Sequence, residues 1–461
     1  MDVKELKEKL CYEPVHACTQ GEDVINQADE FCVGYKTFLD NGKTEREVVQ
    51  EVVAEAEKNG FEPFVQDKKY KPGDKFYYNN RGKAVILGVC GEKGCSEGVR
   101  ISAAHIDSPR LDLKPNPMYE DSEIAYLKTH YYGGIRKYQW PVMPLAMHGV
   151  ICKTDGTTIN ICIGEKDDDP KFCITDLLPH LAANQSQRKL SEGIKGEELN
   201  VVIGSRPISN DEEGKLVKLN ILNILFETFG ITEADFLSAE IEMVPAGKSD
   251  DIGFDRSLIG AYGHDDRVCA YPAFRAILDC GIPEKTALTV LTDKEETGSD
   301  GNTGLNSSYL KYFICDLAKS EGFDGWRIMS KSECLSADVN SAFDPTFSDV
   351  FEKRNSSFIN HGVVITKYTG ARGKSGTSDA SAEFMAKIRT ILDKNDIVWQ
   401  TGELGKVDEG GGGTVAKYVA SLNIDVVDLG VPVLSMHAPY ELISKLDIYM
   451  AYRAFLEFFK F

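Results

Sequence analysis

The sequence predicts an α/β fold: a mostly parallel, mixed sheet with helices on both faces, interrupted by an inserted β-rich domain. Apolar, strand-like runs alternate with helix-like segments near both ends of the chain, a pattern typical of parallel sheets covered on both faces. After Pro109, short β-rich runs separated by Pro and Gly replace this alternation, which returns from about Gly253. A chain of 461 residues is also too long for one ordinary core. We therefore expect one domain built from residues 1–108 and 253–461, with residues 109–252 inserted.

Hydrophobic periodicity predicts the individual elements. In the first part, apolar residues at helical spacing predict a helix over residues 47–58, and continuous apolar runs predict buried strands over 84–89 and 99–104. The insert has short runs that predict strands over residues 149–153, 158–163, 199–204 and 237–244. The last part predicts strands over residues 286–291, 363–366 and 425–429, helices over 268–280, 308–319, 378–394 and 446–459, and a glycine run at 410–413 that opens a helix ending at 420.

Composition excludes several functional classes. The net charge of −20 argues against nucleic acid and anionic membranes as partners, because such a surface repels phosphate. No apolar stretch approaches the roughly 20 residues of a membrane span, and the charged start lacks a signal-peptide core, so we expect a cytoplasmic protein. Most of the twelve cysteines lie in apolar segments and are expected to be reduced, whereas Cys90 and Cys95 are expected to mark a hairpin tip.

Acids and histidines follow apolar runs at five places, and this recurrence is the strongest indication of function. Ligands of open α/β sheets bind beyond the carboxyl ends of the strands, so groups far apart in the sequence can converge there. The five positions are His105 with Asp107, Asp265 with Asp266, Glu295 with Glu296, Asp338, and His437. Two histidines and several carboxylates suit Zn²⁺, Co²⁺ or Mn²⁺ in a catalytic site that keeps positions open for water.

Such a set of ligands can hold two ions. A dinuclear centre needs one carboxylate that spans both ions, and either Asp265 or Asp266 is placed to do so. A further carboxylate must stay free to take a proton from water, and either Glu295 or Glu296 could supply it. Adjacent acids are tolerated in such a site because the cations offset their mutual repulsion.

These residues resemble the aspartyl aminopeptidase and aminopeptidase I family of dinuclear zinc exopeptidases, and the similarity covers most of the chain. The segments that carry it include His105–Lys114, Ser336–Asn340 and Ser435–Glu441. The resemblance implies that the metal ligands are His105, Asp265, Glu296, Asp338 and His437, that Asp107 supports His105, that Glu295 is the general base, and that Lys367 lies in the substrate pocket. His264, next to the bridging acid, is expected to have a supporting or surface role.

At several positions the chain departs from the family pattern. Asp266 replaces the usual asparagine, Ala438 and Gly413 replace serines, Lys406 replaces arginine, and Asn184 replaces a histidine in a loop of the insert. These changes leave the metal site intact and affect the specificity pocket. Both acidic and neutral N-terminal residues are therefore open as substrates.

The resemblance implies an activity and an assembly. The expected enzyme is a metallo-aminopeptidase that removes the N-terminal residue from short peptides with a free amino terminus. The attacking water would bridge two divalent ions per subunit, with zinc favoured and cobalt or manganese as alternatives. The insert would be a dimerisation domain, and the family pattern implies a homo-oligomer, namely a tetrahedral dodecamer built from dimers.

Two other hypotheses stay open at this point. The first is a different dinuclear metal hydrolase on the same scaffold, such as a deacylase or a carboxypeptidase, because fold and metal centre do not settle the substrate. The second is a self-assembling scaffold with an inactive site. A requirement for a free α-amino group would exclude the first hypothesis, and stoichiometric bound metal would argue against the second.

Overall fold

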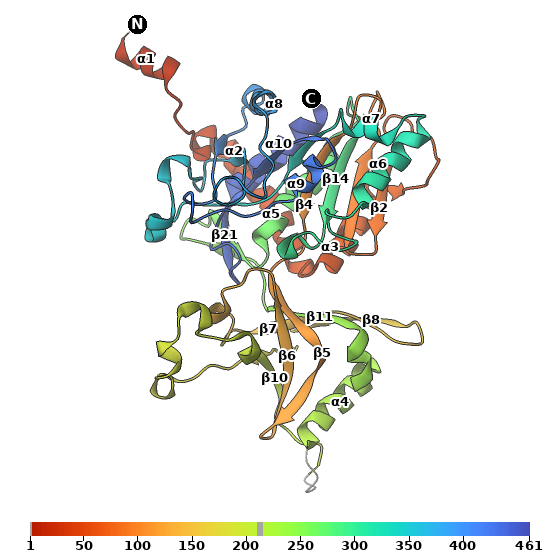
Figure 1. Cartoon of the computed structure of the whole chain (residues 1–461), viewed down its shortest axis with the longest axis vertical. Coiled ribbons are helices and arrows are strands. Elements are labelled where there is room, and N and C mark those ends of the chain that lie inside the picture. The colour runs from red at the N-terminus through yellow and green to blue at the C-terminus, as the bar shows by residue number, and fades with distance from the viewer. Residues whose placement is uncertain (1, 210–214) are drawn as a thin grey trace.

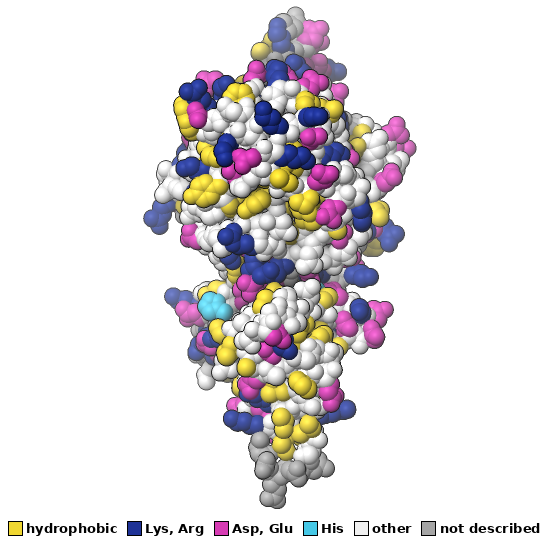
Figure 2. Space-filling model, turned by 90° about the vertical axis from the view of Figure 1, so that its right-hand side faces the viewer, with side chains coloured by type: hydrophobic (Ala, Val, Ile, Leu, Met, Phe, Trp, Pro, Cys, Tyr) yellow, Lys and Arg dark blue, Asp and Glu magenta, His cyan; other side chains and the backbone are white. Residues whose placement is uncertain are grey.

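The computed structural model describes residues 2–209 and 215–461, which form two lobes joined by a narrower region (Figures 1 and 2). The upper lobe in Figure 1 contains both ends of the chain and a nine-stranded mixed sheet. The lower lobe contains a second sheet of seven strands. This architecture is the α/β class with an additional β-rich part that the sequence predicts.

The nine-stranded sheet has a parallel centre. Across the sheet, its strands are β1 (Glu62–Pro63), β2 (Lys75–Asn80), β3 (Ala84–Val89), β14 (Ala287–Thr292), β4 (Arg100–His105), β15 (Glu333–Ser336), β19 (Asp425–Gly430), β17 (Val363–Thr366) and β18 (Trp399–Thr401). Strands β14, β4, β15 and β19 are mutually parallel, and β3 and β17 flank them in the antiparallel sense. Because β14 lies between β3 and β4, the hairpin expected at Cys90 and Cys95 is wrong: these residues connect two strands that are not neighbours.

Helices cover both faces of this sheet. One face carries α2 (Glu22–Asn41), α3 (Glu45–Lys58), α5 (His264–Asp279), α8 (Ala382–Lys394) and α10 (Lys445–Lys460), and the other carries α6 (Tyr309–Ser320), α7 (Gly325–Met329) and α9 (Ala416–Ala420). Along β3, Val85 and Leu87 pack on the first face, whereas Ala84 and Ile86 pack on the second. Successive strand residues point to opposite faces, so a strand covered on both faces is apolar throughout. Helix α1 (Val3–Leu10) projects from this lobe (Figure 1).

The lower lobe is an antiparallel sheet with one long helix. Its strands, in spatial order, are β8 (Thr158–Ile163), β7 (Leu145–Cys152), β11 (Ala239–Pro245), β5 (Arg110–Asp121), β6 (Ile124–Tyr132), β10 (Asn200–Gly204) and β9 (Cys173–Ile174). Helix α4 (Leu216–Phe229) packs against this sheet through Ile221, Leu222 and Leu225. The sequence did not indicate α4, because its apolar residues occur on every side and form no single stripe.

A five-stranded sheet near the junction of the lobes was also not expected. Its strands, in spatial order, are β12 (Asp250–Ile252), β13 (Leu258–Ala261), β21 (Glu441–Ser444), β20 (Pro432–Leu434) and β16 (Asn340–Ser341). These strands are two to four residues long and come from three distant parts of the chain, so local pattern could not reveal their pairing.

Helix α5 begins at His264, four residues before the predicted start, and helices α8 and α9 are shorter than expected. Helix α8 begins at Ala382, four residues later than predicted, because the Ser381 side chain accepts a hydrogen bond from the backbone N–H of Phe384 and caps the helix there. Helix α9 is limited to five residues.

All twelve cysteines are free thiols. Among the described residues, none of the helices is both long and apolar enough to cross a bilayer.

Candidate metal centre

Three neighbouring parallel strands bring most of the predicted ligands to one edge of the sheet. Strand β4 ends at His105, and its neighbours β14 and β15 end shortly before Glu295 and Asp338. Asp265 lies in the first turn of α5, and His437 lies between β20 and β21. These side chains converge, as the rule for the carboxyl ends of parallel strands predicts.

Asp265 lies between the two histidines. Its Oδ1 is 3.0 Å from Nε2 of His105, and its Oδ2 is 3.2 Å from Nε2 of His437. Asp338 and Glu296 complete two groups around this shared carboxylate: Asp338 Oδ1 lies 3.9 Å from His105 Nε2, and Glu296 Oε2 lies 3.7 Å from His437 Nε2. In each group the ligand atoms lie within 4.8 Å of one another.

The other acid that the sequence left open as a bridge, Asp266, is placed differently. It is buried, but it belongs to none of the potential metal-binding groups found among the described residues. Burial raises its pKa well above the ordinary value. Of the two neighbours, only Asp265 faces both histidines.

Glu295, which follows the end of β14, faces the space between these predicted ligands. Its Oε2 lies 4.0 Å from His105 Nε2, and burial raises its pKa to about 7. Glu295 lines a cavity of about 520 Å³ together with Asp265, Glu296, Asp338 and His437. A carboxylate with such a pKa can exchange a proton near neutral pH. Since Glu295 and Glu296 also form one close group with His105, geometry alone leaves either of them able to bind an ion.

The electrostatics of this site fit divalent cations. Burial and neighbouring acids raise the pKa values of Glu296 and Asp338 well above normal. Among the described residues, the ion pairs of these carboxylates run only to the two histidines, and Glu296 Oε1 is buried without a hydrogen-bond donor. Imidazole nitrogens and carboxylate oxygens, crowded together without Lys or Arg partners, are the donor set that suits Zn²⁺.

Asp107 holds several parts of the site together. Its Oδ1 accepts the backbone N–H of Glu295 at 3.1 Å, and its Oδ2 accepts that of Glu296 at 3.2 Å. Nδ1 of His105 donates to the Asp107 carbonyl oxygen at 3.0 Å and lies 3.4 Å from Oδ1. This contact directs Nε2 of His105 toward Asp265. These contacts are of the kind that a carboxylate supporting a metal-binding histidine makes.

Three positioning groups were not recognised in the sequence. Buried Glu441 accepts the backbone N–H groups of His437 at 2.8 Å and of Asp265 at 3.1 Å. From the lower lobe, the Tyr132 hydroxyl donates to Asp107 Oδ2 at 2.8 Å, and the Gly134 carbonyl accepts from Nδ1 of His437 at 3.0 Å. A carboxylate at the start of the apolar strand β21 was the only signal for Glu441, and no local signal pointed to the other two.

His264 and Lys367 lie outside the centre. Nδ1 of His264 accepts from the Tyr35 hydroxyl at 2.8 Å, and Nε2 donates to the Ile259 carbonyl at 3.2 Å. Burial lowers the pKa of His264 to about 3, so it is a neutral, buried histidine with a supporting rather than a surface role.

Lys367 pairs with Asp379, away from the cavity that the predicted metal ligands line. Its neighbour Thr366 lines that cavity, because adjacent residues of an extended segment point to opposite sides. The lysine that lines the cavity is Lys417 of α9, which had no sequence signal. The structure thus brings together all predicted metal ligands but not the predicted pocket lysine.

The fold and the site together define a metal-dependent hydrolase. The model of the family "Aminopeptidase I zinc metalloprotease (M18)" matches residues 38–459, and the chain belongs to this family. It is therefore a zinc aminopeptidase, a metallo-exopeptidase. The probable M18 family aminopeptidase 1 of Clostridium acetobutylicum is 51% identical over 433 residues, which cover 92% of this chain and 93% of that protein.

Solved structures agree with this assignment. The M18 family aminopeptidase of Thermotoga maritima has a TM-score of 0.93 at 43% identity and covers 97% of this chain and 99% of its own. Aminopeptidase I from C. acetobutylicum has a TM-score of 0.92 at 46% identity, with coverage of 98% and 100%. The S. cerevisiae mApe1 dodecamer shares the fold, with a TM-score of 0.77 at 20% identity over 94% of this chain and 97% of that one.

We expect Tyr132→Phe to weaken zinc binding by about 10–100-fold, because Asp107 loses the donor that holds its carboxylate against His105. Competition with a chromophoric chelator measures the affinity. The matched control is Tyr131→Phe, on the same strand but partly exposed, which should leave the affinity unchanged. Equal affinities for the two variants would contradict the assigned role of Tyr132.

We also expect metal loading at pH 7 to release protons and the affinity to rise with pH. Burial lowers the pKa of His437, but its hydrogen bond with Asp265 and the negative charges of Glu296 and Asp265 together outweigh burial and raise the pKa to about 10. His437 therefore carries a proton at pH 7 that a metal ion must displace. Calorimetry in buffers of different ionisation enthalpy measures the release, and a binding enthalpy that is independent of buffer would refute it.

Proposed function

We propose that this aminopeptidase holds two divalent ions, zinc in first place, with Asp265 shared between them. His105 and Asp338 complete one set of ligands, and His437 and Glu296 complete the other. The observation that carries the proposal is the position of Asp265, whose two oxygens each face one histidine nitrogen. A carboxylate that faces two groups of ligands is the feature that a dinuclear centre requires.

Glu295 is the general base in this proposal. Two bound ions would polarise the scissile carbonyl and lower the pKa of a bound water. Glu295 takes a proton from the attacking water and returns it to the leaving nitrogen. Its backbone N–H is held by Asp107, and its carboxylate lines the cavity without an ion pair to Lys or Arg among the described residues. The substrates are short peptides with a free amino terminus.

The lower lobe supports assembly into a homo-oligomer. Leu219, Ile224 and Phe226 of α4 are exposed, although an apolar helix is normally covered on most sides. The distant mApe1 structure is a dodecamer, which agrees with a dimer-based tetrahedral dodecamer. We propose residues 109–252 as the dimerisation domain and residues 1–108 and 253–461 as the catalytic domain, since the seven-stranded sheet runs from Arg110 to Pro245. The cytoplasmic location stays a prediction.

A panel of aminoacyl and dipeptide substrates, each paired with its N-acetylated form, tests the proposed function. Protein loaded with Zn²⁺, Co²⁺ or Mn²⁺ should cleave only the forms with a free amine. Cleavage of the acetylated forms alone would show a deacylase or another hydrolase. Assembly is tested separately by the molar mass in solution.

Glu295→Gln should lower kcat by about 10²–10⁴-fold, because the amide cannot accept the proton of the attacking water. Bound metal should stay at the wild-type stoichiometry, measured by plasma emission on the same sample. Glu383→Gln, at an exposed position on α8, is the control and should keep full activity. If Glu295→Gln retained most activity, the base would be wrongly assigned, and if it lost an ion, Glu295 would be a ligand.

Lys417→Gln should lower kcat/KM for substrates with N-terminal Asp or Glu by about 10–100-fold, because a charge-assisted hydrogen bond is lost. Neutral substrates should be unaffected. Lys367→Gln is the matched control, because its ammonium already pairs with Asp379. A selective loss in Lys367→Gln instead would restore the sequence prediction, and no loss in either variant would indicate a preference for neutral residues.

A further inference from the structure

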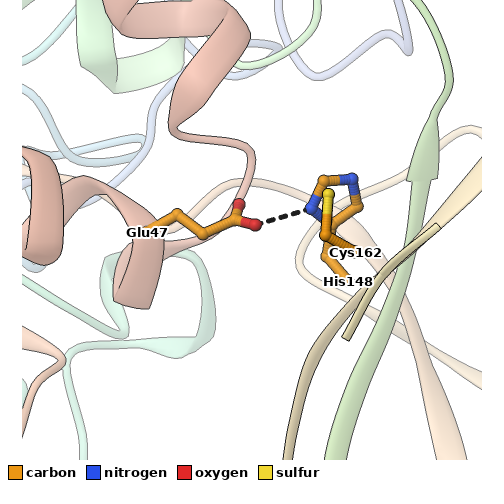
Figure 3. Close-up of side chains that lie close together, drawn as sticks. All are labelled: Glu47, His148 and Cys162. Carbon is orange, nitrogen blue, oxygen red and sulfur yellow. Dashed lines mark hydrogen bonds and ion pairs between the residues drawn. The ribbon is translucent and has the colours of Figure 1, made fainter. Parts of the chain in front are cut away.

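A second group of metal-ligating side chains lies at the junction of the two lobes and shares no residue with the candidate centre (Figure 3). It consists of Glu47 on α3 of the upper lobe, and of His148 on β7 and Cys162 on β8 of the lower lobe. One ligand atom from each residue lies within 4.8 Å of the other two. The group therefore joins nitrogen, oxygen and sulfur donors from both lobes.

The sheet places two of these donors side by side. His148 and Cys162 are directly opposite each other in the antiparallel pairing of β7 with β8, so their side chains share one face. Glu47 approaches that face from α3 and points at the imidazole, beside which the Cys162 sulfur lies (Figure 3).

The imidazole of His148 is held as a metal ligand would be. His148 is only 2% exposed. Its Nε2 lies 3.0 Å from Oε1 of Glu165, and its Nδ1 lies 2.7 Å from Oε1 of Glu47. Metal-bound histidines commonly donate the other ring N–H to a carboxylate, which fixes the tautomer. Here Glu165 accepts from Nε2 and leaves Nδ1 directed at Glu47.

Glu47 is also fixed in advance. Its Oε2 accepts the backbone N–H groups of Lys43 at 3.0 Å and Thr44 at 3.1 Å, as part of the capping box of α3. The helix start therefore orients the carboxylate and leaves Oε1 for His148. A ligand that is already ordered loses little side-chain entropy when it binds an ion.

The charges at this junction favour a cation. Glu47 and Glu165 bring two negative charges, and Cys162 adds a third once an ion has displaced its thiol proton, whereas the nearby ammonium of buried Lys43 brings one positive charge and donates to the Gly247 carbonyl at 2.6 Å. Burial lowers the pKa of His148, but its hydrogen bonds with Cys162, Glu165 and Glu47 together raise it to about 11, so an ion must also displace a proton from the imidazole. Thiolate, imidazole and carboxylate together suit Zn²⁺ or Co²⁺ better than Mg²⁺ or Mn²⁺.

We propose that Glu47, His148 and Cys162 form an additional binding site for a thiophilic divalent cation of the zinc type, with Glu165 orienting His148. Cys162 is exposed, so water can occupy a fourth position. Binding displaces the thiol proton and any Nδ1 proton to solvent. Because its ligands come from both lobes, the ion fastens α3 to the sheet of the lower lobe. This site is independent of the proposed catalytic centre.

Cobalt titration tests this proposal. The full-length, reduced protein is stripped with a chelator and titrated with Co²⁺, while near-ultraviolet absorption, bound cobalt and peptide cleavage are followed. The proposed catalytic centre contains no sulfur ligand, so thiolate-to-cobalt charge-transfer absorption reports on the additional site alone. The wild type should show this absorption. Cys152→Ser, which removes an exposed cysteine from β7, is the matched control and should behave as the wild type does.

Cys162→Ser should lose the charge-transfer absorption and one equivalent of cobalt but keep peptide cleavage. Glu165→Gln should keep the absorption and weaken binding at this site by about 10–100-fold. Absence of the absorption in the wild type, with equal cobalt content in Cys162→Ser, would overturn the proposal and leave His148 as a protonated imidazole. Absorption that survives in Cys162→Ser would also overturn it. If the wild type showed the charge-transfer absorption but cleaved no peptide, the result would count against the proposed catalytic function and not against the additional metal site.

Discussion

The parallel register of β14, β4 and β15 is the constraint on which the candidate centre depends. Thr292 at the end of β14 lies opposite His105 at the end of β4, and Ser336 of β15 lies opposite Ala103. The residues that follow each strand therefore emerge at one edge of the sheet. Apolar helices on both faces hold these strands in place, so the side chains beyond the strand ends converge without forming a compact motif in the sequence.

The candidate centre places several carboxylates in a buried part of the protein. Asp107, Asp265 and Asp338 are at least nine-tenths buried, which disfavours their ionised forms. Backbone N–H groups relieve part of this penalty at Asp107 and Glu441, and the two histidines relieve part at Asp265. Glu296 Oε1 stays uncompensated, because it is buried without a hydrogen-bond donor. The same burial that costs stability in the metal-free chain gives the ions a strong local field.

The lower lobe contributes contacts to the candidate centre. The Gly134 carbonyl orients the predicted ligand His437, and Tyr132 donates to Asp107, which in turn contacts the predicted ligand His105. On the other side of the junction, Glu47 and His148 join α3 to β7. A change in the angle between the lobes would move both sets of contacts, which links any assembly through the lower lobe to the geometry of the centre.

The sequence by itself determined the fold class, the approximate insert and the residue types of the centre, because apolar periodicity and acids after strands are local signals. Local pattern singled out His105, Asp338, His437 and the two acid pairs, the family resemblance assigned Asp265 and Glu296 within those pairs, and these side chains converge in the structure. Only the tertiary structure showed that Asp265 rather than Asp266 faces both histidines, placed Lys417 rather than Lys367 in the cavity, and revealed Glu441, Tyr132 and the junction of Glu47 with His148. These features depend on side-chain direction and on contacts between residues 25 to 176 positions apart, which local pattern does not encode.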